Sequence, residues 1–155
     1  MLEKCKFVLD NLRKEDLQEL EANWGLDWKS KILGSLKDKK IHFAFGKDDK
    51  NNIVPIAMGG FQQIFIDNPE IACVWLLTTK YVYKNKLALL RVVRAYIIAS
   101  EKKYEILYNY IYKSNKQAKN WLLKLGFCFD NPKPRGLILK DGFEFFYKIN
   151  NRKEK

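Results

Sequence analysis

The chain has 155 residues, of which 47% are hydrophobic and 14% aromatic, which suits one domain with a full core. Its apolar runs fall far short of the roughly 18 residues that span a bilayer. Charges at Glu3, Lys4 and Lys6 interrupt the apolar stretch that a signal peptide needs. We therefore expect an intracellular protein with a single domain over residues 1–149 and a flexible basic tail over 150–155.

The charge balance is strongly basic, with 29 Lys and Arg against 18 Asp and Glu, a net charge of +11. One interpretation is attraction to polyanions such as nucleic acid, phosphate-bearing cofactors or acidic protein surfaces. The other is that a biased genome supplies many lysines, which only solvate the surface. Both stay open at this point.

Cysteine and histidine usage argues against a metal site. Cys5, Cys73 and Cys128 are widely spaced, Cys73 lies in an apolar run, and Cys128 lies between two phenylalanines. This pattern predicts buried, unbridged thiols in a reducing compartment. Without a CxxC pair, and with His42 as the sole histidine, we expect no zinc site.

The first part of the chain predicts a short strand, two helices and a hairpin. In order, these are a strand at 5–10, a helix opening at 16, a helix over 27–36, and strands at 41–45 and 53–58. Asp16 is the expected N-cap of the first helix. The pair Gly59-Gly60 then predicts a bulge or a close backbone approach.

The second part predicts alternating strands and helices. In order, these are a strand at 71–79, a helix at 86–103, a strand at 105–112, a helix at 115–125, and strands at 127–129 and 143–149. The unbroken apolar run IACVWLLTT is typical of a strand buried on both faces. A right-handed β-α-β crossover is expected here. The predicted fold class is thus α/β, a mixed sheet with helices on both faces.

Two details of these helices can be tested. The helix at 86–103 should bury one apolar stripe and expose Arg91 and Arg94. That stripe comprises Leu89, Val92, Val93, Tyr96 and Ile97. The helix at 115–125 should begin at an Asn115 cap and end at Gly126.

Three segments carry a family resemblance. LRKEDL (12–17) resembles a first strand entering helix one, IAMGG (56–60) a third strand that presents a glycine, and NKQAKNWLLKLGF (115–127) an N-x-x-A…K-x-G-F segment. Together with the element order, they resemble the GNAT N-acetyltransferases. A closer likeness is to acetyltransferase-like internal virion proteins of T7-like phages. It rests on the Gly-Gly pair, the Trp-bearing strand running into TT, and the segment YEILYNYIYKSN, and it covers roughly 56–149.

The resemblance implies an acetyl-CoA site where the strand at 71–79 splays from that at 105–112. In an active GNAT protein a Q/R-x-x-G-x-G/A loop turns its amides toward the cofactor pyrophosphate at a helix N-terminus. Here the stretch TTKYVYKNKLALL has no glycine, and the side chains of Tyr83, Asn85 and Leu87 occupy that space. This stretch is either an ordinary strand-to-helix turn or a pyrophosphate-binding turn in which lysines supply the positive charge and Asn85 caps the helix. The implied cofactor-binding residues are Leu77, Thr78, Thr79, Lys84, Asn85, Lys86 and Asn115.

The catalytic residues that the resemblance implies are missing. The position of the family's general-acid tyrosine falls on Leu122, and the strand at 71–77 has no carboxylate, Glu70 lying just outside it. Substitutes are Tyr108, Tyr110 and His42, with Tyr112, Gln62 and Gln63 as further polar groups. Each of these also suits packing or hydrogen bonding.

Three functional hypotheses follow. The first is a phage-type GNAT-fold protein with a degenerate acetyl-CoA site, made in the host cytoplasm and associated with the virion or its assembly. Its partners would be other virion proteins or a host protein, with nucleic acid contacted through the basic surface. The second is an active acetyl-CoA-dependent N-acetyltransferase acting on a protein or a small amine. The third is a basic nucleic-acid-binding module that stacks bases on its tyrosine-rich strand.

Overall fold

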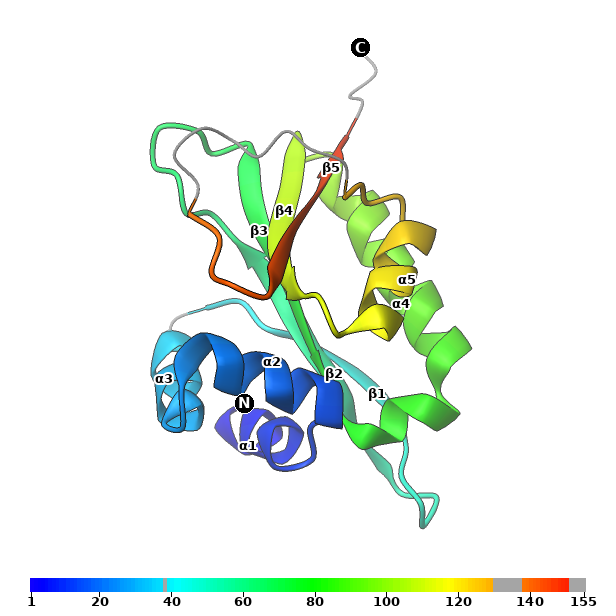
Figure 1. Ribbon diagram of the computed structural model, residues 1–155. Coiled ribbons are helices and arrows are strands. Elements are labelled where there is room, and N and C mark those ends of the chain that lie inside the picture. The colour runs from blue at the N-terminus through cyan, green and yellow to red at the C-terminus, as the bar shows by residue number, and fades with distance from the viewer. Residues whose placement is uncertain (38, 130–137, 151–155) are drawn as a thin grey trace. The chain divides into compact units, whose positions relative to one another are not determined.

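The computed structural model describes residues 1–37, 39–129 and 138–150. Within them a five-stranded sheet has the order β1-β2-β3-β4-β5 (Figure 1). The strands are β1 (His42–Lys47), β2 (Ile53–Gln62), β3 (Ile71–Thr78), β4 (Ile106–Tyr112) and β5 (Phe143–Ile149). The helices are α1 (Leu2–Asp10), α2 (Lys14–Trp24), α3 (Trp28–Ser35), α4 (Lys86–Ser100), α5 (Lys116–Lys124) and the 3-10 helix η1 (Lys80–Lys84).

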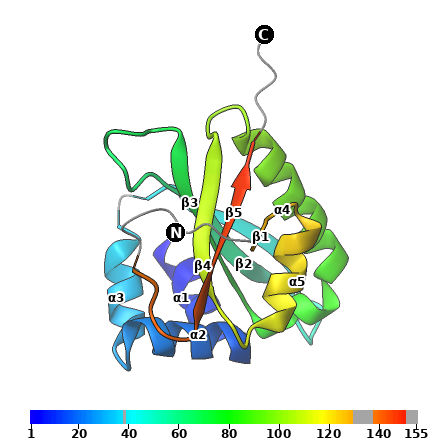
Figure 2. The same cartoon turned by 45° about the horizontal axis from the view of Figure 1, so that its top comes forward.

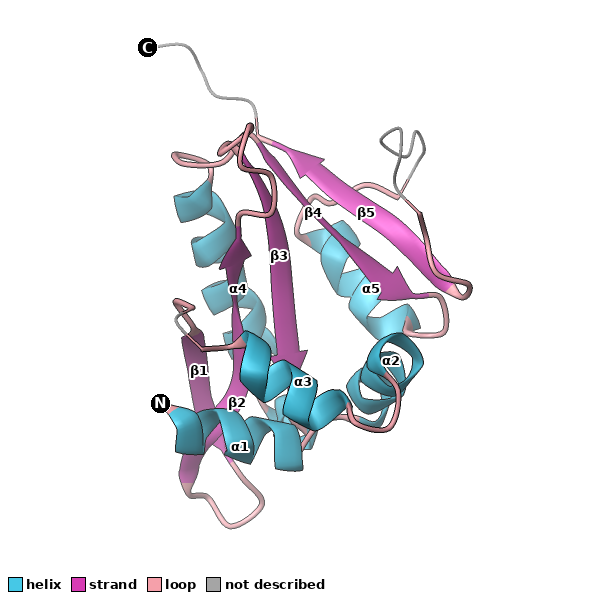
Figure 3. Cartoon of the chain, turned by 90° about the vertical axis from the view of Figure 1, so that its left-hand side faces the viewer, coloured by secondary structure: helices cyan, strands magenta, loops and turns pink. Residues whose placement is uncertain are grey.

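The sheet is mixed. Strand β1 runs antiparallel to β2, and β4 runs antiparallel to β5, as the opposite arrowheads of β4 and β5 show in Figure 3. Strands β3 and β4, joined through α4, are parallel, with Ile71–Cys73 in register with Ile106–Tyr108. Beyond that register the Asn109 side-chain amide donates to the Val74 carbonyl oxygen at 2.7 Å. The predicted fold class, a mixed α/β sheet that carries helices, is confirmed.

The chain divides into two compact units. The first unit comprises Met1–Gly60 and Trp75–Val92, and the second comprises Phe61–Val74 and Val93–Lys155. Strands β2 and β3 and helix α4 each run from one unit into the other. A single domain over residues 1–149 stays a prediction.

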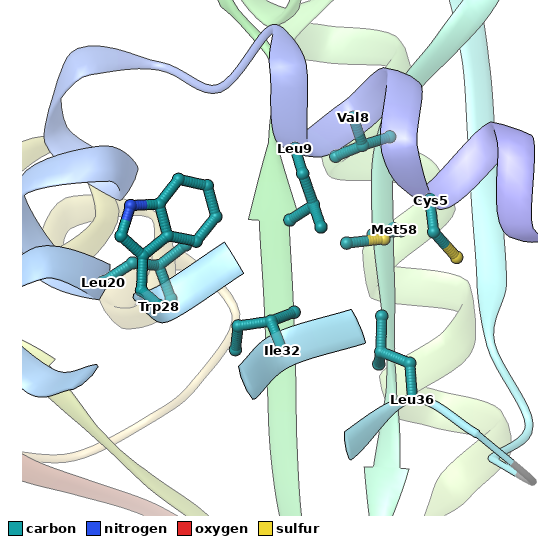
Figure 4. Close-up of a cluster of buried hydrophobic side chains, with 8 residues drawn as sticks. All are labelled: Cys5, Val8, Leu9, Leu20, Trp28, Ile32, Leu36 and Met58. Carbon is teal, nitrogen blue, oxygen red and sulfur yellow. The ribbon is translucent and has the colours of Figure 1, made fainter. Parts of the chain in front are cut away.

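The core of the first unit joins α1, α2 and α3 to β2. Its buried members are Cys5, Val8, Leu9, Leu20, Trp28, Ile32, Leu36 and Met58 (Figure 4). The predicted strand at 5–10 is wrong, because this segment is part of α1. Cys5, Val8 and Leu9 are spaced three and one residues apart, so one helical face buries all of them. The helix predicted over 27–36 is confirmed as α3, with Asp27 preceding its first residue.

Strand β2 runs straight through its two glycines. A Cβ on Gly59 would lie 2.6 Å from the Trp75 carbonyl oxygen, and one on Gly60 would lie 2.9 Å from the Lys40 carbonyl oxygen. The close backbone approach predicted at this pair is therefore confirmed. The irregularity of the β1–β2 register lies elsewhere, between Ala44 and Phe45.

The core of the second unit joins β4 and β5 to α5 and the second half of α4. Figure 2 shows β4 between β3 and β5. The buried members are Ala72, Ile97, Tyr104, Leu107, Ile111, Phe127 and Phe146, and Ala118, Leu122 and Leu125 pack against them. Alternation along β4 therefore points Leu107 and Ile111 toward the helices. Tyr108 and Tyr110 face the opposite way.

Both predicted caps of α5 are present. The Asn115 side-chain oxygen accepts from the Ala118 amide at 3.3 Å, and Gly126 follows the helix with φ +86°, a conformation that favours glycine. The strand predicted at 127–129 is reduced to one bridge, between Cys128 and Tyr147.

Two predictions about burial differ from the structure, one for the cysteines and one for the C-terminal tail. Cys5 is buried and Cys73 half-buried, but Cys128 is exposed, so the prediction of a buried thiol is wrong there. Asn150, placed by the sequence in the tail, is buried, and its side-chain amide donates to the Tyr104 carbonyl oxygen at 2.9 Å. The rest of the predicted tail, 151–155, lies outside the described residues.

Burial along β3 and α4 is less complete than predicted. On β3, Leu76 is 38% exposed, so the strand is not buried on both faces. On α4, Leu89 and Ile97 are buried as expected, but Val92 and Tyr96 are 41% and 39% exposed. Arg91 and Arg94 are exposed, as predicted.

Candidate functional site

The end of β3 is held by a buried network of charged and polar groups in the first unit. Arg13, Asp16 and Thr78 are only 4%, 6% and 4% exposed. The Arg13 guanidinium donates to both oxygens of the Asp16 carboxylate, at 2.5 and 3.3 Å. One of those oxygens also accepts from the Thr78 amide at 2.9 Å and the Thr78 hydroxyl at 2.5 Å. The carboxylate is thus fully satisfied, as burial requires.

This network corrects one prediction and explains a motif. Asp16 is not the N-cap of α2, which begins at Lys14 after Arg13. Its carboxylate reaches across to β3 because the Arg13 amide donates to the Thr78 carbonyl oxygen at 3.0 Å, which brings the start of α2 to that strand. The Arg and Asp of the LRKEDL segment therefore hold two chain segments together.

The backbone beyond Thr78 is engaged in the same way. The Thr79 amide donates to the Ile56 carbonyl oxygen at 2.8 Å, and the Lys80 amide donates to the Asn11 carbonyl oxygen at 2.9 Å. Thr79 is fully buried, and Leu77 packs against the core of the first unit. Of the predicted cofactor residues, Thr78 and Thr79 therefore have their amides bonded within the protein.

The segment that precedes α4 is the 3-10 helix η1, and Asn85 fixes its end. The Asn85 side-chain amide donates to the carbonyl oxygens of Lys47 and Tyr81 at 3.2 and 3.0 Å. Its side-chain oxygen lies 3.5 Å from the Lys47 amide, which donates to it. The expected role as a side-chain cap of α4 is replaced by a tie to β1.

The remaining predicted groups of this segment are exposed. Lys84 pairs with Asp49 at 2.7 Å, and the Lys86 ammonium lies 5.2 Å from the centroid of the Tyr83 ring. The Tyr83 hydroxyl donates to Glu15 at 3.1 Å. Burial, followed by Glu15, raises the pKa of Tyr83. Leu87 is 72% exposed.

These residues do not form the glycine cradle that the family resemblance implies. The amides of Thr78, Thr79 and Lys80 have partners within the chain. Asn85 uses its side chain for β1, and lysines are the cationic groups left at the surface. The two predicted cofactor-binding lysines, Lys84 and Lys86, already contact Asp49 and Tyr83.

The second unit presents an aromatic face on β4 and β5, opposite its core. We use this name for the side chains of Phe65, Tyr108, Tyr110 and Phe145. The Tyr110 and Phe145 rings are a cross-strand pair with centroids 5.8 Å apart. Tyr108 lies 6.0 Å from Phe145 and 6.0 Å from Phe65, which comes from the loop before β3. Such spacings are typical of attractive aromatic pairs.

The two tyrosines of this face are poor bases. Burial, with a smaller contribution from nearby Cys73, raises the pKa of Tyr108 to about 12. The same causes raise the pKa of Tyr110. Both phenols are therefore protonated at neutral pH and can donate a hydrogen bond or a proton. Neither hydroxyl has a hydrogen-bond partner among the described residues.

The other predicted site residues are not part of this face. His42 is on β1 in the first unit, where burial and then Lys40 lower its pKa. Asn115 is the buried cap of α5. Leu122 packs in the core. Only Tyr108 and Tyr110, of the predicted catalytic residues, are brought together.

Phe65 and Phe145 were missed by the sequence reasoning. The alternation of Phe143, Phe145 and Tyr147 in FEFFYKI matches that of Tyr108 and Tyr110 in β4, and it was the available signal for Phe145. Nothing in the sequence indicated that the loop places Phe65 against Tyr108.

In the described ranges, no group of three or more His, Cys, Asp or Glu is arranged to hold a metal ion. The same ranges contain no helix with the length and apolar character needed to cross a membrane.

Comparison with known proteins identifies the fold of the chain through solved structures alone. No protein-family model matches the sequence, and no curated protein does. Among solved structures, a GNAT-family acetyltransferase from Bacillus anthracis superposes with a TM-score of 0.67 at 9% identity, covering 98% of this chain and 92% of that chain.

Two other solved structures agree. A chimera of spermidine N-acetyltransferase SpeG from Vibrio cholerae and hSSAT gives a TM-score of 0.63 at 13% identity, covering 98% and 95% of the two chains. Tetrahymena GCN5 gives 0.57 at 16% identity, covering 94% and 87%. At such identities the likeness concerns the fold. The chain therefore has the fold of the GNAT acetyltransferases.

Proposed function

We propose that this chain is a phage-type GNAT-fold protein with a degenerate acetyl-CoA site, and that it acts by binding partners in the virion or during its assembly. The observation that carries the proposal is that polar groups of the predicted cofactor-binding residues are hydrogen-bonded within the chain. The Thr78 amide donates to Asp16, the Thr79 amide donates to the Ile56 carbonyl oxygen, and the Asn85 side-chain amide donates to the Lys47 carbonyl oxygen. Unpaired amides are what an anion-binding turn needs.

The virion part of the proposal is supported by the resemblance of residues 56–149 to internal virion proteins of T7-like phages. A net charge of +11 favours contact with packaged DNA or with acidic protein surfaces. Mass spectrometry of purified particles should find the chain, and its absence from them would remove this part.

Calorimetry tests the degenerate site. We expect no saturable heat when acetyl-CoA is titrated into the protein to millimolar concentration, at low salt where lysine contacts are strongest. Coenzyme A without the acetyl group is the control for non-specific attraction of its phosphates. Saturable binding of acetyl-CoA in the micromolar range would contradict the proposal.

The second candidate is an active N-acetyltransferase, and the aromatic face favours it. Tyr108 and Tyr110 present protonated phenols on β4, and Tyr108 is the last residue of β4 in register with β3. A general acid needs a proton to donate at the pH of the reaction. Acetylation of a panel of amines and lysine peptides, followed by mass spectrometry, tests this activity. Product that disappears in Tyr108→Phe but remains in Tyr96→Phe would favour the second candidate over the first.

A further inference from the structure

The solvent side of helix α4 is unlike that of helix α2. A surface helix normally carries charged and polar residues on its solvent side, and α2 does so with Lys14, Gln18, Glu21 and Asn23. Helix α4 buries Leu89, Ile97 and Ser100, yet most of its exposed side chains are apolar. The exposed residues of α4 are Lys86, Leu87, Ala88, Arg91, Val92, Arg94, Ala95, Tyr96, Ile98 and Ala99.

Five of these exposed residues lie on one side of the helix. Leu87, Arg94, Ala95 and Ile98 are four, three, four and seven residues from Arg91, spacings that share one helical side. Because α4 is one continuous helix, helical geometry alone places them there. Leu87 is 72% exposed and Ile98 is 56% exposed. We call this set the α4 outer face.

The charges of the α4 outer face are not neutralised by the chain. Neither Arg91 nor Arg94 forms an ion pair with any residue that the structure describes. The sequence has no Asp or Glu between Glu70 and Glu101, and Glu101 itself pairs with Lys148 at 3.3 Å. The face is therefore both apolar and basic, with no carboxylate on its own helix.

Both cations of this face are arginines, in a chain with five arginines among its 29 Lys and Arg residues. Arginine is enriched and lysine depleted where proteins contact each other. The planar guanidinium can also bond a carboxylate through two parallel N–H groups. Two arginines between exposed leucine and isoleucine side chains therefore suit a protein partner that supplies carboxylates and apolar groups.

We propose that the α4 outer face binds an acidic segment of a partner protein. Carboxylates of that segment pair with Arg91 and Arg94, while its apolar side chains cover Leu87 and Ile98. The proposal rests on the partner-binding role proposed above, and it adds the surface that binds and the chemistry of the partner.

Three other occupants suit this face less well. A second copy that packed α4 against α4 would bring arginines together without a carboxylate. A nucleic acid would pair with the arginines but would leave Leu87 and Ile98 beside phosphates, whereas protein–DNA interfaces are polar and strongly basic. A lipid surface needs an apolar side free of charge, and here the arginines lie between the two large apolar side chains.

Matched peptides test the chemistry of the partner. The probe is a helical peptide of Glu, Leu and Ala with glutamates three and four residues apart, and its control carries Gln in place of each Glu. In a titration of the full chain followed by amide chemical shifts, we expect the Glu peptide to shift amides of α4. The Gln peptide should bind about twofold to thirtyfold more weakly, the range for two exposed ion pairs.

Matched charge variants locate the site. Arg91→Gln combined with Arg94→Gln should weaken binding of the Glu peptide by a similar factor, and the Glu and Gln peptides should then bind this variant alike. Lys14→Gln combined with Lys37→Gln removes the same positive charge from exposed positions on other segments. This control should change the affinity less than twofold.

A second pair of variants tests the apolar contact. Ile98→Gln should weaken binding of either peptide by about threefold to tenfold, because the side chain would lose the burial that the partner gives it. Leu26→Gln, at a side chain that is 96% exposed between α2 and α3, should change nothing. All the substituted side chains are exposed, and wild-type amide spectra away from each substitution would show that the variant is folded.

Three results would overturn the proposal. One is the absence of α4 shifts with the Glu peptide at millimolar concentration. Another is equal weakening by the arginine and lysine variants, which would indicate a general attraction to a basic protein. The third is an equal shift of α4 amides by a DNA duplex or by phosphatidylglycerol vesicles at the same concentration of negative charge. Saturable acetyl-CoA binding, or absence from purified particles, would contradict the proposed function and leave these peptide results unchanged.

Discussion

The end of β3 in the first unit and the aromatic face of the second use their functional groups in opposite ways. At the end of β3, the Asp16 carboxylate and the Thr78 amide and hydroxyl are bonded to one another or to Arg13. On the aromatic face, the Tyr108 and Tyr110 hydroxyls have no partner among the described residues. The contrast teaches that the polar groups of the LRKEDL segment and of the end of β3 stabilise the fold, whereas the two phenol hydroxyls of the aromatic face are not used in that way.

The largest expected effect comes from breaking the buried ion pair. Asp16→Ala leaves the Arg13 guanidinium buried without its carboxylate, so the free energy of unfolding should fall by about 3–5 kcal/mol. Urea denaturation measures this change. The control is Asp10→Ala, whose exposed carboxylate pairs with Lys29, and which should cost less than about 1 kcal/mol. Similar losses in the two variants would show that the network is not a tight structural element.

A second effect tests how closely the backbone packs in the first unit. Gly59→Ala would bring a Cβ to 2.6 Å from the Trp75 carbonyl oxygen, and a backbone atom cannot rotate away. The expected loss of stability is about 1–3 kcal/mol. The matched control is Gly34→Ala in α3, where an added Cβ has no neighbour within 4 Å. It should stabilise the protein by about 0.5–1 kcal/mol, since alanine favours helix.

Removing one hydroxyl from the end of β3 and one from the aromatic face tests the contrast between these two regions directly. Thr78→Val deletes the hydroxyl that donates to Asp16 at 2.5 Å and should lower the free energy of unfolding by about 1–2 kcal/mol. Tyr110→Phe deletes a hydroxyl without a described partner and should change it by less than about 0.5 kcal/mol. Equal losses of unfolding free energy in Thr78→Val and Tyr110→Phe would show that the hydroxyls of the two regions contribute equally to stability, against this comparison.

Much of the fold follows from local pattern. Strand–helix–strand periodicity predicted β3, α4 and β4 and their parallel arrangement, and the caps at Asn115 and Gly126 are local rules that held. The strand predicted at 5–10 was wrong because a pattern of only six residues fits either a strand or a helix, and only packing against α3 and β2 decides between them.

The candidate site was harder to predict for a related reason. Asp16 looked like an N-cap because its partner, Thr78, lies 62 residues away in the chain. Asn85 looked like a cap of α4 because its tie to Lys47 spans 38 residues. Partners so distant in sequence leave no local spacing that could reveal them, so only the folded chain shows which polar groups remain available.

The smallest expected effect is a change in the pH dependence of stability. Burial raises the pKa of Tyr108 from its ordinary value of 10.0 to about 12. The folded protein therefore retains this proton to higher pH than the unfolded chain does. The stabilising contribution is complete below about pH 10 and is lost as the pH rises through about 12.

Tyr108→Phe removes that contribution, so its stability should fall less steeply than that of the wild type between about pH 10 and 12. Urea unfolding at neutral pH and across this window measures the two slopes. Lysines also titrate there, but they do so in both proteins, so the difference between the curves isolates Tyr108. Because Tyr108 is only 6% exposed, parallel curves would mean that water reaches its hydroxyl in the folded state. The aromatic face would then be open to solvent at Tyr108, and burial would not be what holds its proton.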